Sequence, residues 1–290
     1  MHIIKLNFRS FIFLKRRKKV TARLIIIYAI LAAMAIIALF PLYWIFVTAF
    51  QWPTMIISMP PKMFPHPITL VNLVRVVRAS LIIRWMCNSV FVSICGTVST
   101  VLLSTLAGYV LAKKRFPGHD LIFWGILATL LIPNQLTMIP LFTLFHRIHL
   151  TDTYWGLIIP EMTGPYAIFL MTQYLRSLPT EIFEAAKIDG CSELGIFWRI
   201  VLPLAKPGIA VLGIFAFVWN WNSFLWPLII TSSEEMRVLQ VGLATLQVHY
   251  MTDYGLLMAG VVITAIPIFI VFFIFQKYFL RGITIGAIKA

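Results

Sequence analysis

The chain has 290 residues, of which 60% are apolar and only 12% are charged. A water-soluble domain of this length is usually about half apolar and about a quarter charged, so the composition excludes an ordinary soluble fold. The net charge of +14 does not indicate a nucleic-acid partner, because eight of the 24 Lys and Arg precede residue 24 and an apolar run follows at once. That order is typical of the cytoplasmic flank of a membrane anchor, with a basic nucleic-acid-binding arm as the alternative.

Six apolar runs are long enough to cross a hydrocarbon core about 30 Å thick as helices. The first is too long for the core of a signal peptide and is interpreted as a retained helix. The sequence therefore predicts an all-α, polytopic membrane protein, because a helix satisfies its own backbone in lipid. The predicted transmembrane helices cover residues 24–50, 85–112, 121–146, 153–176, 207–231 and 255–278.

The distribution of positive charge predicts that both termini are cytoplasmic. Eighteen of the 24 Lys and Arg fall in the segments expected inside and six in those expected outside. The first outer loop, 51–84, fits least well, because it has four positive residues and no acid. The predicted domains are a basic cytoplasmic arm (1–23), a first transmembrane helix with an extracytoplasmic loop (24–84), a transmembrane domain (85–278) and a cytoplasmic tail (279–290).

Prolines interrupt the third, fourth, fifth and sixth predicted spans. Each proline removes one helical hydrogen bond and kinks the helix, which membrane proteins tolerate beside neighbouring helices or water-filled cavities. For any one position, ordinary kinked packing and a transport path are both open, and four broken helices together favour a transport path. The residues are Pro133, Pro140, Pro160, Pro165, Pro227 and Pro267.

The segment 177–203, on the inner side, is the one long inner stretch between spans that is not apolar. It is predicted to form two short helices around a turn. Thr180 is expected to cap the first helix, and Gly190 suits the left-handed position that follows a helix. Ser192 is expected to cap the second helix, and Pro203 to end it at the membrane.

This segment has features of a docking surface for a cytoplasmic protein. Ala185 and Ala186 leave a smooth stretch that fits a groove of a partner, and Glu184 and Asp189 offer charged contacts. An amphipathic helix pair lying on the membrane surface is the alternative. The expected apolar anchors are Ile182, Phe183, Phe197 and Ile200.

The same segment resembles the EAA loop of the permeases of binding-protein-dependent ABC importers. That pattern is matched by Glu184-Ala185-Ala186, by Gly190, and by Ile200-Val201-Leu202-Pro203. Cys191 departs from the Ala usual in the family, but both residues are small. Further segments are similar to carbohydrate-uptake permeases, and the C-terminal Gly-Ala-Ile-Lys to the MalG-like maltose permeases: Ile188–Gly190, Pro133–Phe142, Trp221–Pro227 and Arg281–Lys289.

The resemblance implies a type I ABC importer permease in a bacterial cytoplasmic (inner) membrane. The implied partners are a second permease in a heterodimer, two ATPase subunits, an extracytoplasmic solute-binding protein and membrane lipid. ATP and Mg would be used by the ATPase, so we expect no cofactor, metal or catalytic residue in this chain and do not expect it to be an enzyme. The residues implied to dock the ATPase are Glu181, Glu184, Ala185, Ala186, Lys187, Asp189, Gly190, Cys191, Ile200, Leu202 and Pro203.

Polar residues within the spans are candidates for the translocation path. Glu161 either lines this path or faces the outer water. Asn220 and Asn222 are two residues apart, so they face different sides of a helix. Trp219, Trp221 and Trp226 either stack on sugar rings or belong to the interfacial aromatic belt. The full set of path candidates is Asn134, Gln135, Glu161, Asn220, Asn222 and Ser223.

Three other functions compete with carbohydrate import. A secondary transporter would use intramembrane carboxylates and often has internal repeats, but Glu161 is the one candidate carboxylate and the halves show no repeat. A membrane enzyme would need clustered catalytic residues, and the six His residues are scattered. An ABC importer for another nutrient, such as an amino acid, glycerol phosphate or a polyol, is the nearest alternative, and the sequence does not identify the solute.

Overall fold

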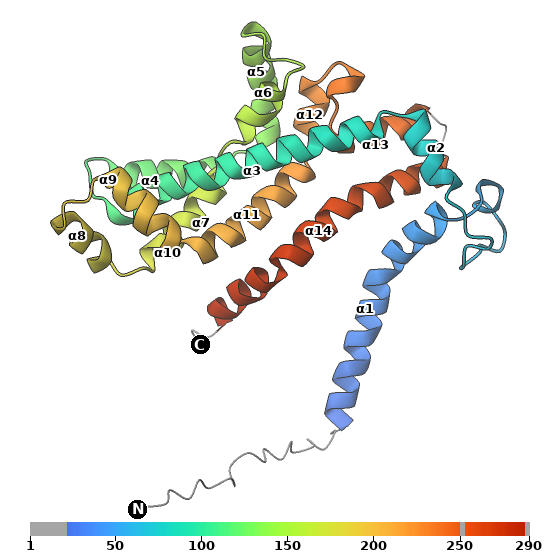
Figure 1. Ribbon diagram of the computed structural model, residues 1–290, viewed down its shortest axis with the longest axis horizontal. Coiled ribbons are helices and arrows are strands. Elements are labelled where there is room, and N and C mark those ends of the chain that lie inside the picture. Colours follow the sequence, from blue (N-terminus) through green and yellow to red (C-terminus); the bar gives the residue numbers. More distant parts are fainter. Residues whose placement is uncertain (1–21, 250–252, 288–290) are drawn as a thin grey trace, which may run out of the picture. The chain divides into compact units, whose positions relative to one another are not determined.

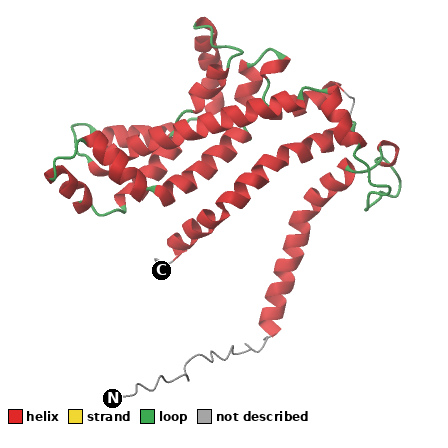
Figure 2. Ribbon diagram, viewed as in Figure 1, coloured by secondary structure: helices red, strands yellow, loops and turns green. Residues whose placement is uncertain are grey.

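The computed structural model describes residues 22–249 and 253–287, and all regular secondary structure in these ranges is helical (Figure 2). The chain divides into two units, residues 1–44 and 45–290, which are described separately. Most of the predicted basic arm, 1–23, lies outside the described residues. The last helix, α14 (Tyr254–Ala287), continues through most of the predicted tail, 279–290.

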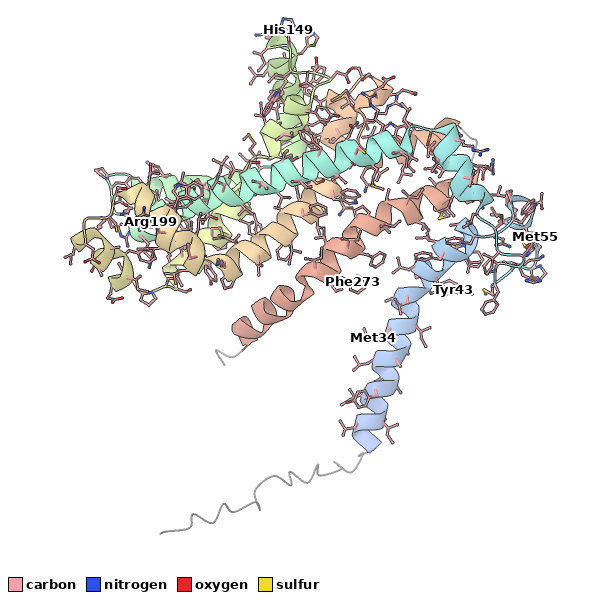
Figure 3. The ribbon with its side chains drawn as sticks, viewed as in Figure 1. Met34, Tyr43, Met55, His149, Arg199 and Phe273 are labelled. Carbon is pink, nitrogen blue, oxygen red and sulfur yellow. The ribbon has the colours of Figure 1, made fainter. Side chains whose placement is uncertain are left out.

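The first unit contains most of helix α1 (Ala22–Ala49). Leu24–Ala49 has a mean hydropathy of 2.7, and Met34 and Tyr43 are among its exposed apolar residues (Figure 3). Pro41 lies inside this helix without ending it. The predicted first span is therefore a single long apolar helix.

The second unit is built on α3 (Ile82–Lys113), a helix of 32 residues. Helices α7 (Pro165–Arg176) and α11 (Lys206–Trp221) pack along it, and α14 packs on α11 (Figure 1). Gly108 permits the close approach of α3 and α7, because a Cβ at this residue would lie 2.9 Å from both Met171 Cβ and Thr172 N. This helical bundle carries the candidate site at its Lys113 end.

Three helices in the described part of the chain are long and apolar enough to cross a membrane, and five are if each of two bent pairs counts as one span. α4 (His119–Thr129) and α5 (Asn134–Arg147) bend by 98° at the break before Asn134, and the second bent pair meets at 80° just before α11. The predicted fourth span is broken: it consists of α6 (Tyr154–Ile158), η2 (Ile159–Glu161) and α7.

The prolines explain part of this pattern. Pro133 lies at the break before α5, and Pro160 lies within η2. Pro165 occupies the first turn of α7, where its missing N–H costs nothing because the first N–H groups of a helix have no partner within the helix. Pro140 and Pro267 lie inside α5 and α14. Pro227 lies in α12 (Leu225–Ile230), a short helix after α11.

Helices α5 and α6 form an arm that projects from the side of the α3 bundle, with His149 at its tip (Figures 1 and 3). The base of the arm is fixed by an apolar cluster that includes Phe145, Leu157 and Trp226. Trp226 is 4% exposed and its indole Nε1–H donates to the Gly156 carbonyl at 2.9 Å. Trp226 is therefore a core residue, in neither of the two roles predicted for it.

Several short elements that sequence periodicity did not reveal lie in the segments 51–81 and 231–249. They are η1 (Pro53–Met55), α2 (Val71–Ala79), η4 (Glu234–Met236) and α13 (Leu239–His249). Trp85 Nε1 donates to Glu234 O at 2.7 Å, and Asn88 Nδ2 donates to the carbonyls of Glu235 and Arg237. These bonds attach η4 and α13 to the first turns of α3.

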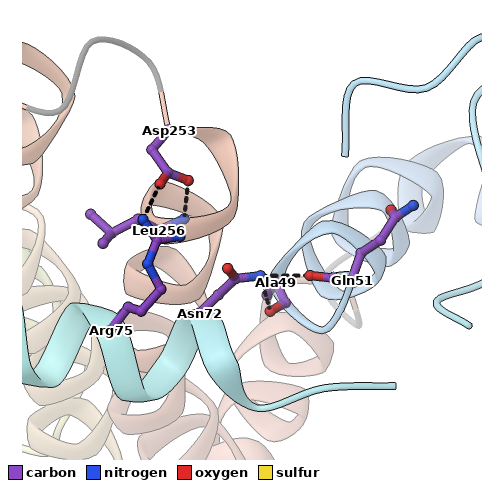
Figure 4. Close-up of polar contacts among 6 residues, drawn as sticks. All are labelled: Ala49, Gln51, Asn72, Arg75, Asp253 and Leu256. Carbon is purple, nitrogen blue, oxygen red and sulfur yellow. Dashed lines mark hydrogen bonds and ion pairs between the residues drawn. The ribbon is translucent and has the colours of Figure 1, made fainter. Parts of the chain in front are cut away.

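An acidic residue from a distant segment forms an ion pair with the basic first outer loop. Arg75 on α2 pairs with Asp253 Oδ2 at 2.6 Å, while Asp253 Oδ1 accepts from Leu256 N at the start of α14 (Figure 4). Asn72 Nδ2 donates to the carbonyls of Ala49 and Gln51, at 3.1 and 2.7 Å. Asp253 follows Arg75 by 178 residues, so the absence of acid within 51–84 does not leave Arg75 unpaired.

Candidate functional site

The segment 177–203, here called the coupling loop, lies at the Lys113 end of the bundle, where Arg199 marks it in Figure 3. It contains α8 (Glu181–Ile188), α9 (Glu193–Ile196), a π-helical stretch (Phe197–Val201) and α10 (Leu202–Leu204). The two predicted helices around a turn are confirmed. Pro203 does not end the second helix, because α10 continues to Leu204 and the chain then bends into α11.

The turn between the two helices depends on Gly190. This residue has φ +78° and directly follows the C-terminal cap of α8. Gly190 N donates to Lys187 O and Cys191 N to Ala186 O, both at 3.0 Å, which is the bond pattern of a Schellman motif. The predicted left-handed glycine is confirmed, and a Cβ here would meet nothing within 4 Å in the subunit.

One of the two predicted helix caps is wrong. Ser192 caps α9 as predicted, because its hydroxyl accepts from Gly195 N at 3.2 Å. Thr180 makes no capping bond to α8. Its Oγ1 instead accepts from Lys113 Nζ at 3.2 Å, and the same ammonium donates to Leu178 O at 2.6 Å. Lys113 therefore fastens the entry of the coupling loop to α3.

The apolar residues of the coupling loop divide into an inner and an outer set. Phe183, Phe197 and Ala186 are buried in the cluster between α3, α7 and α11, so these predicted contacts with a partner are wrong. Ile200 and Leu202 are half-buried against the same cluster. Ile182 and Ile188 are exposed, Ile188 by 87%. The inner set holds the loop rigidly on the bundle.

The exposed residues at the end of α8 form a surface that we call the crest: Glu184, Ala185, Ile188, Asp189 and Gly190. In the described part of the chain, no ion pair involves Glu184 or Asp189. Of the other residues predicted to dock an ATPase, Glu181, Lys187 and Pro203 are exposed and Cys191 is half-buried. The crest is thus a small apolar and acidic surface on a rigid base.

A network around Glu193 fixes α9 to α3. Its carboxylate lies 2.6 Å from Lys114 Nζ, 3.0 Å from the Tyr109 hydroxyl that donates to it, and 3.2 Å from Lys187 Nζ. The Lys114 ammonium above all, helped by Tyr109 and Lys187, lowers the pKa of Glu193 from 4.5 to about 2. Lys113 and Lys114 belong to the positive residues that indicate the orientation of the chain, whereas no local pattern in the sequence pointed to Tyr109 or Glu193.

The substitution Glu193→Gln removes the carboxylate of this network and is expected to change how the stability of the protein depends on pH. A carboxyl with a lowered pKa stabilises the fold above its unfolded pKa and loses that contribution as pH falls towards the folded pKa. The advantage of the wild type over Glu193→Gln should be constant from pH 8 to about 5 and vanish between about pH 4.5 and 2. The side chain of Glu193 is 54% exposed, so the difference should be about 1 kcal/mol or less.

Thermal unfolding of the purified subunit in detergent measures this difference. Glu184→Gln is the matched control, because Glu184 is an exposed carboxylate of the same loop without a described ion pair. It should leave the unfolding temperature unchanged at every pH. Equal curves for the Glu193 variant and the control would contradict the role assigned to the network.

The polar residues predicted for the path are not gathered in one place. Asn134 and Gln135 are exposed on the first turn of α5, at the arm, and Ser223 is half-buried after α11. Asn220 is 7% exposed and packs on Gly96, where a Cβ would lie 2.5 Å from Asn220 Oδ1. Asn220 therefore faces α3, whereas Asn222 is exposed, so the prediction that the two face different sides is confirmed.

Glu161 lies beside the middle part of α3. Its carbonyl accepts from Thr100 Oγ1 at 2.8 Å, and Thr100 lies well inside α3, about 20 Å from Lys113 at 1.5 Å per residue. Its carboxylate Oε2 accepts from Trp219 Nε1 at 3.1 Å. Trp219 is 62% exposed, whereas Trp221 is 1% exposed and belongs to the core, so neither role predicted for Trp221 applies.

Fold and site together define a helical, membrane-embedded protein with a rigid, exposed helical crest at one end. Residues 102–285 match the family of binding-protein-dependent transport system inner membrane components. This match covers more than half of the chain, and the chain belongs to that family.

Relatives of known sequence support the same conclusion. The chain is 40% identical to the arabinooligosaccharides transport system permease protein AraQ of Halalkalibacterium halodurans, over 89% of this chain and 94% of the relative. It is 32% identical to the sn-glycerol-3-phosphate transport system permease protein UgpE of Yersinia enterocolitica, over 86% and 91% of the two chains. Both relatives are transport permeases.

A solved structure has the same fold. A chain from the crystal structure of a bacterial ABC transporter that imports the acidic polysaccharide alginate superposes with a TM-score of 0.79 and 26% identity, covering 88% of this chain and 95% of that one. A second alginate transporter structure, in complex with an alginate pentasaccharide-bound periplasmic protein, matches at 17% identity with a TM-score of 0.52 and supports the fold alone. The fold is that of a type I ABC importer permease.

Proposed function

We propose that this chain is the permease subunit of an ABC importer that carries a carbohydrate across the cytoplasmic membrane of a bacterium. The observation on which the proposal depends is the crest, an exposed apolar and acidic surface held rigidly on the transmembrane bundle. A rigid projection of this kind suits the transfer of movement from a separate protein to the helices behind it. ATP and Mg would then be bound and used by that partner.

The proposed topology has six transmembrane helices and two cytoplasmic termini. The three long apolar helices and the bent pair of α4 and α5 support four of the spans. The fifth would be α11 with α12, because the helical segment before the second bend belongs to the coupling loop. The broken series of α6, η2 and α7 would be the remaining one. Packing of α7 along α3 supports its place within the membrane. The coupling loop and Lys113 would be cytoplasmic, and α2, η4 and α13 would be extracytoplasmic.

The proposed assembly contains this permease, a second permease, two ATPase subunits and an extracytoplasmic solute-binding protein. The crest would enter a groove of one ATPase, with Ile188 as its apolar contact and Glu184 and Asp189 as its charged contacts. The proposed domains are the basic arm (1–23), the first helix and loop (24–84), the transmembrane domain (85–278) and the cytoplasmic tail (279–290).

The proposed solute is a carbohydrate because the relative that transports arabinooligosaccharides is 40% identical, whereas the one that transports sn-glycerol-3-phosphate is 32% identical. Uptake by the reconstituted assembly tests the proposal. Proteoliposomes that contain both permeases and both ATPases should accumulate labelled arabino-oligosaccharide when ATP is enclosed and the binding protein is added. Accumulation of glycerol phosphate instead would support the alternative solute. Accumulation without ATP would contradict the proposal.

A further inference from the structure

Glu161 and Trp219 lie at a break in the transmembrane bundle. The helical chain is interrupted between η2 and Gly164, and α7 begins at Pro165. Thr100 and Ser104 on α3 fix this break, because Thr100 Oγ1 donates to Glu161 O at 2.8 Å and Ser104 Oγ lies 3.0 Å from Thr163 Oγ1. Broken helices at this depth often surround solute sites in transporters, because irregular backbone is tolerated where it lines a cavity.

The Glu161 side chain uses only part of its hydrogen-bonding capacity. Oε2 accepts from Trp219 Nε1 at 3.1 Å, and the described residues provide no partner for Oε1. The unpaired side-chain atoms that are fully buried do not include Oε1. Oε1 is therefore accessible at the surface of the subunit. An acidic side chain within a membrane span is costly and is retained where it contacts a solute or a partner charge.

Trp219 presents a large exposed ring beside this carboxylate. The side chain is 62% exposed although its N–H is bound, so its face is open. Asn222 follows three residues later and is also exposed, which places the two on the same side of α11. An aromatic face next to a carboxylate matches the chemistry of a sugar, whose C–H face stacks on the ring while a hydroxyl donates to the oxygen.

We propose that Glu161 and Trp219 form a solute site in this subunit that selects uncharged carbohydrates over acidic ones. The inference rests on the proposed function and narrows its substrate class. Oε1 accepts a hydroxyl of the sugar and Trp219 holds the ring. The ionised Glu161 carboxylate repels a carboxylated or phosphorylated solute, and this repulsion is stronger at membrane depth than in water.

Uptake of two solutes by the full assembly tests this site. One is a labelled arabino-oligosaccharide, and the other is the same oligosaccharide oxidised to a carboxylate at its reducing end. The binding protein is the same throughout, so its own preference cancels when variants are compared. Glu161→Gln should raise the KM for the neutral solute about tenfold, the effect of losing a hydrogen bond to a charged acceptor, and should raise the carboxylated-to-neutral uptake ratio by a similar factor.

Two further variants separate the roles of the residues. Trp219→Leu should raise the KM for both solutes by about tenfold and leave the ratio unchanged, because it removes the ring and keeps the charge. Glu235→Gln, which removes an exposed carboxylate at the Ile82 end, should change neither value.

Unchanged KM and ratio in Glu161→Gln would overturn the inference, while carbohydrate uptake by the wild type would still uphold the proposed function. Loss of the assembled complex with no change in selectivity would also overturn it, since Glu161 would then pair with a cation of the second permease. A wild type that accumulates neither oligosaccharide would overturn both the site and the proposed function.

Discussion

Replacing Gly190 with Trp is expected to abolish ATP-driven uptake while the binding protein still binds its solute. Gly190 has φ +78° and lies in the exposed crest. A Trp side chain there would strain the turn and also block the approach of another protein to α8. We expect uptake to fall by about 100-fold, which corresponds to roughly 2–3 kcal/mol of docking free energy lost at the centre of an interface.

Gly118→Trp is a matched control for this experiment. Gly118 has φ +82°, and a Cβ there also meets nothing within 4 Å, so the strain of a left-handed backbone is about the same in both variants. Gly118 lies outside the crest, at the start of α4. The Gly190 variant should lose both solute uptake and the ATPase that otherwise purifies with the permease. The Gly118 variant should keep both. Equal losses in both variants would show that strain, and not docking, causes the defect.

Replacing Gly108 with Leu is expected to prevent correct folding of the bundle. A Cβ at Gly108 would lie 2.9 Å from Thr172 N and from Met171 Cβ, so relief requires α3 and α7 to separate. Overpacking of a well-packed core costs about 1–3 kcal/mol, and more where backbone must move. Because Lys113 is the last residue of α3 and Lys114 directly follows it, the separation would move both ammonium groups away from the coupling loop.

The yield of monodisperse protein in detergent, together with its thermal unfolding temperature, measures this effect. Gly125→Leu in α4 is the control, because a Cβ at Gly125 meets nothing within 4 Å. It adds the same side chain to an apolar helix and should leave both values close to those of the wild type. A Gly108 variant that is as stable as this control would contradict the described packing of α3 on α7.

Local signals in the sequence predicted much of the coupling loop. Gly190 and Ser192 have the predicted roles because a left-handed turn and a helix cap depend on a few neighbouring residues. The apolar runs at α1, α3 and α14 predicted long helices for a similarly local reason. The break around Glu161 was indicated by Pro160 and Pro165, since proline acts on the helix that contains it.

The sequence alone did not predict which residues meet across the bundle. Thr180 loses its expected capping role to a bond with Lys113, and Lys114 pairs with Glu193 across 79 residues. Helical periodicity gives the face on which a residue lies, but not the neighbouring helix that the face will contact.

The sequence by itself determined a helical membrane protein with an EAA-type loop and a left-handed glycine in its turn. Only the tertiary structure decided that Ala186 and Phe183 face inward, that Trp221 is core, and that Glu161 meets Trp219. The physical reason is that hydropathy and capping act within one helix, whereas burial and hydrogen-bond partners depend on how several helices pack.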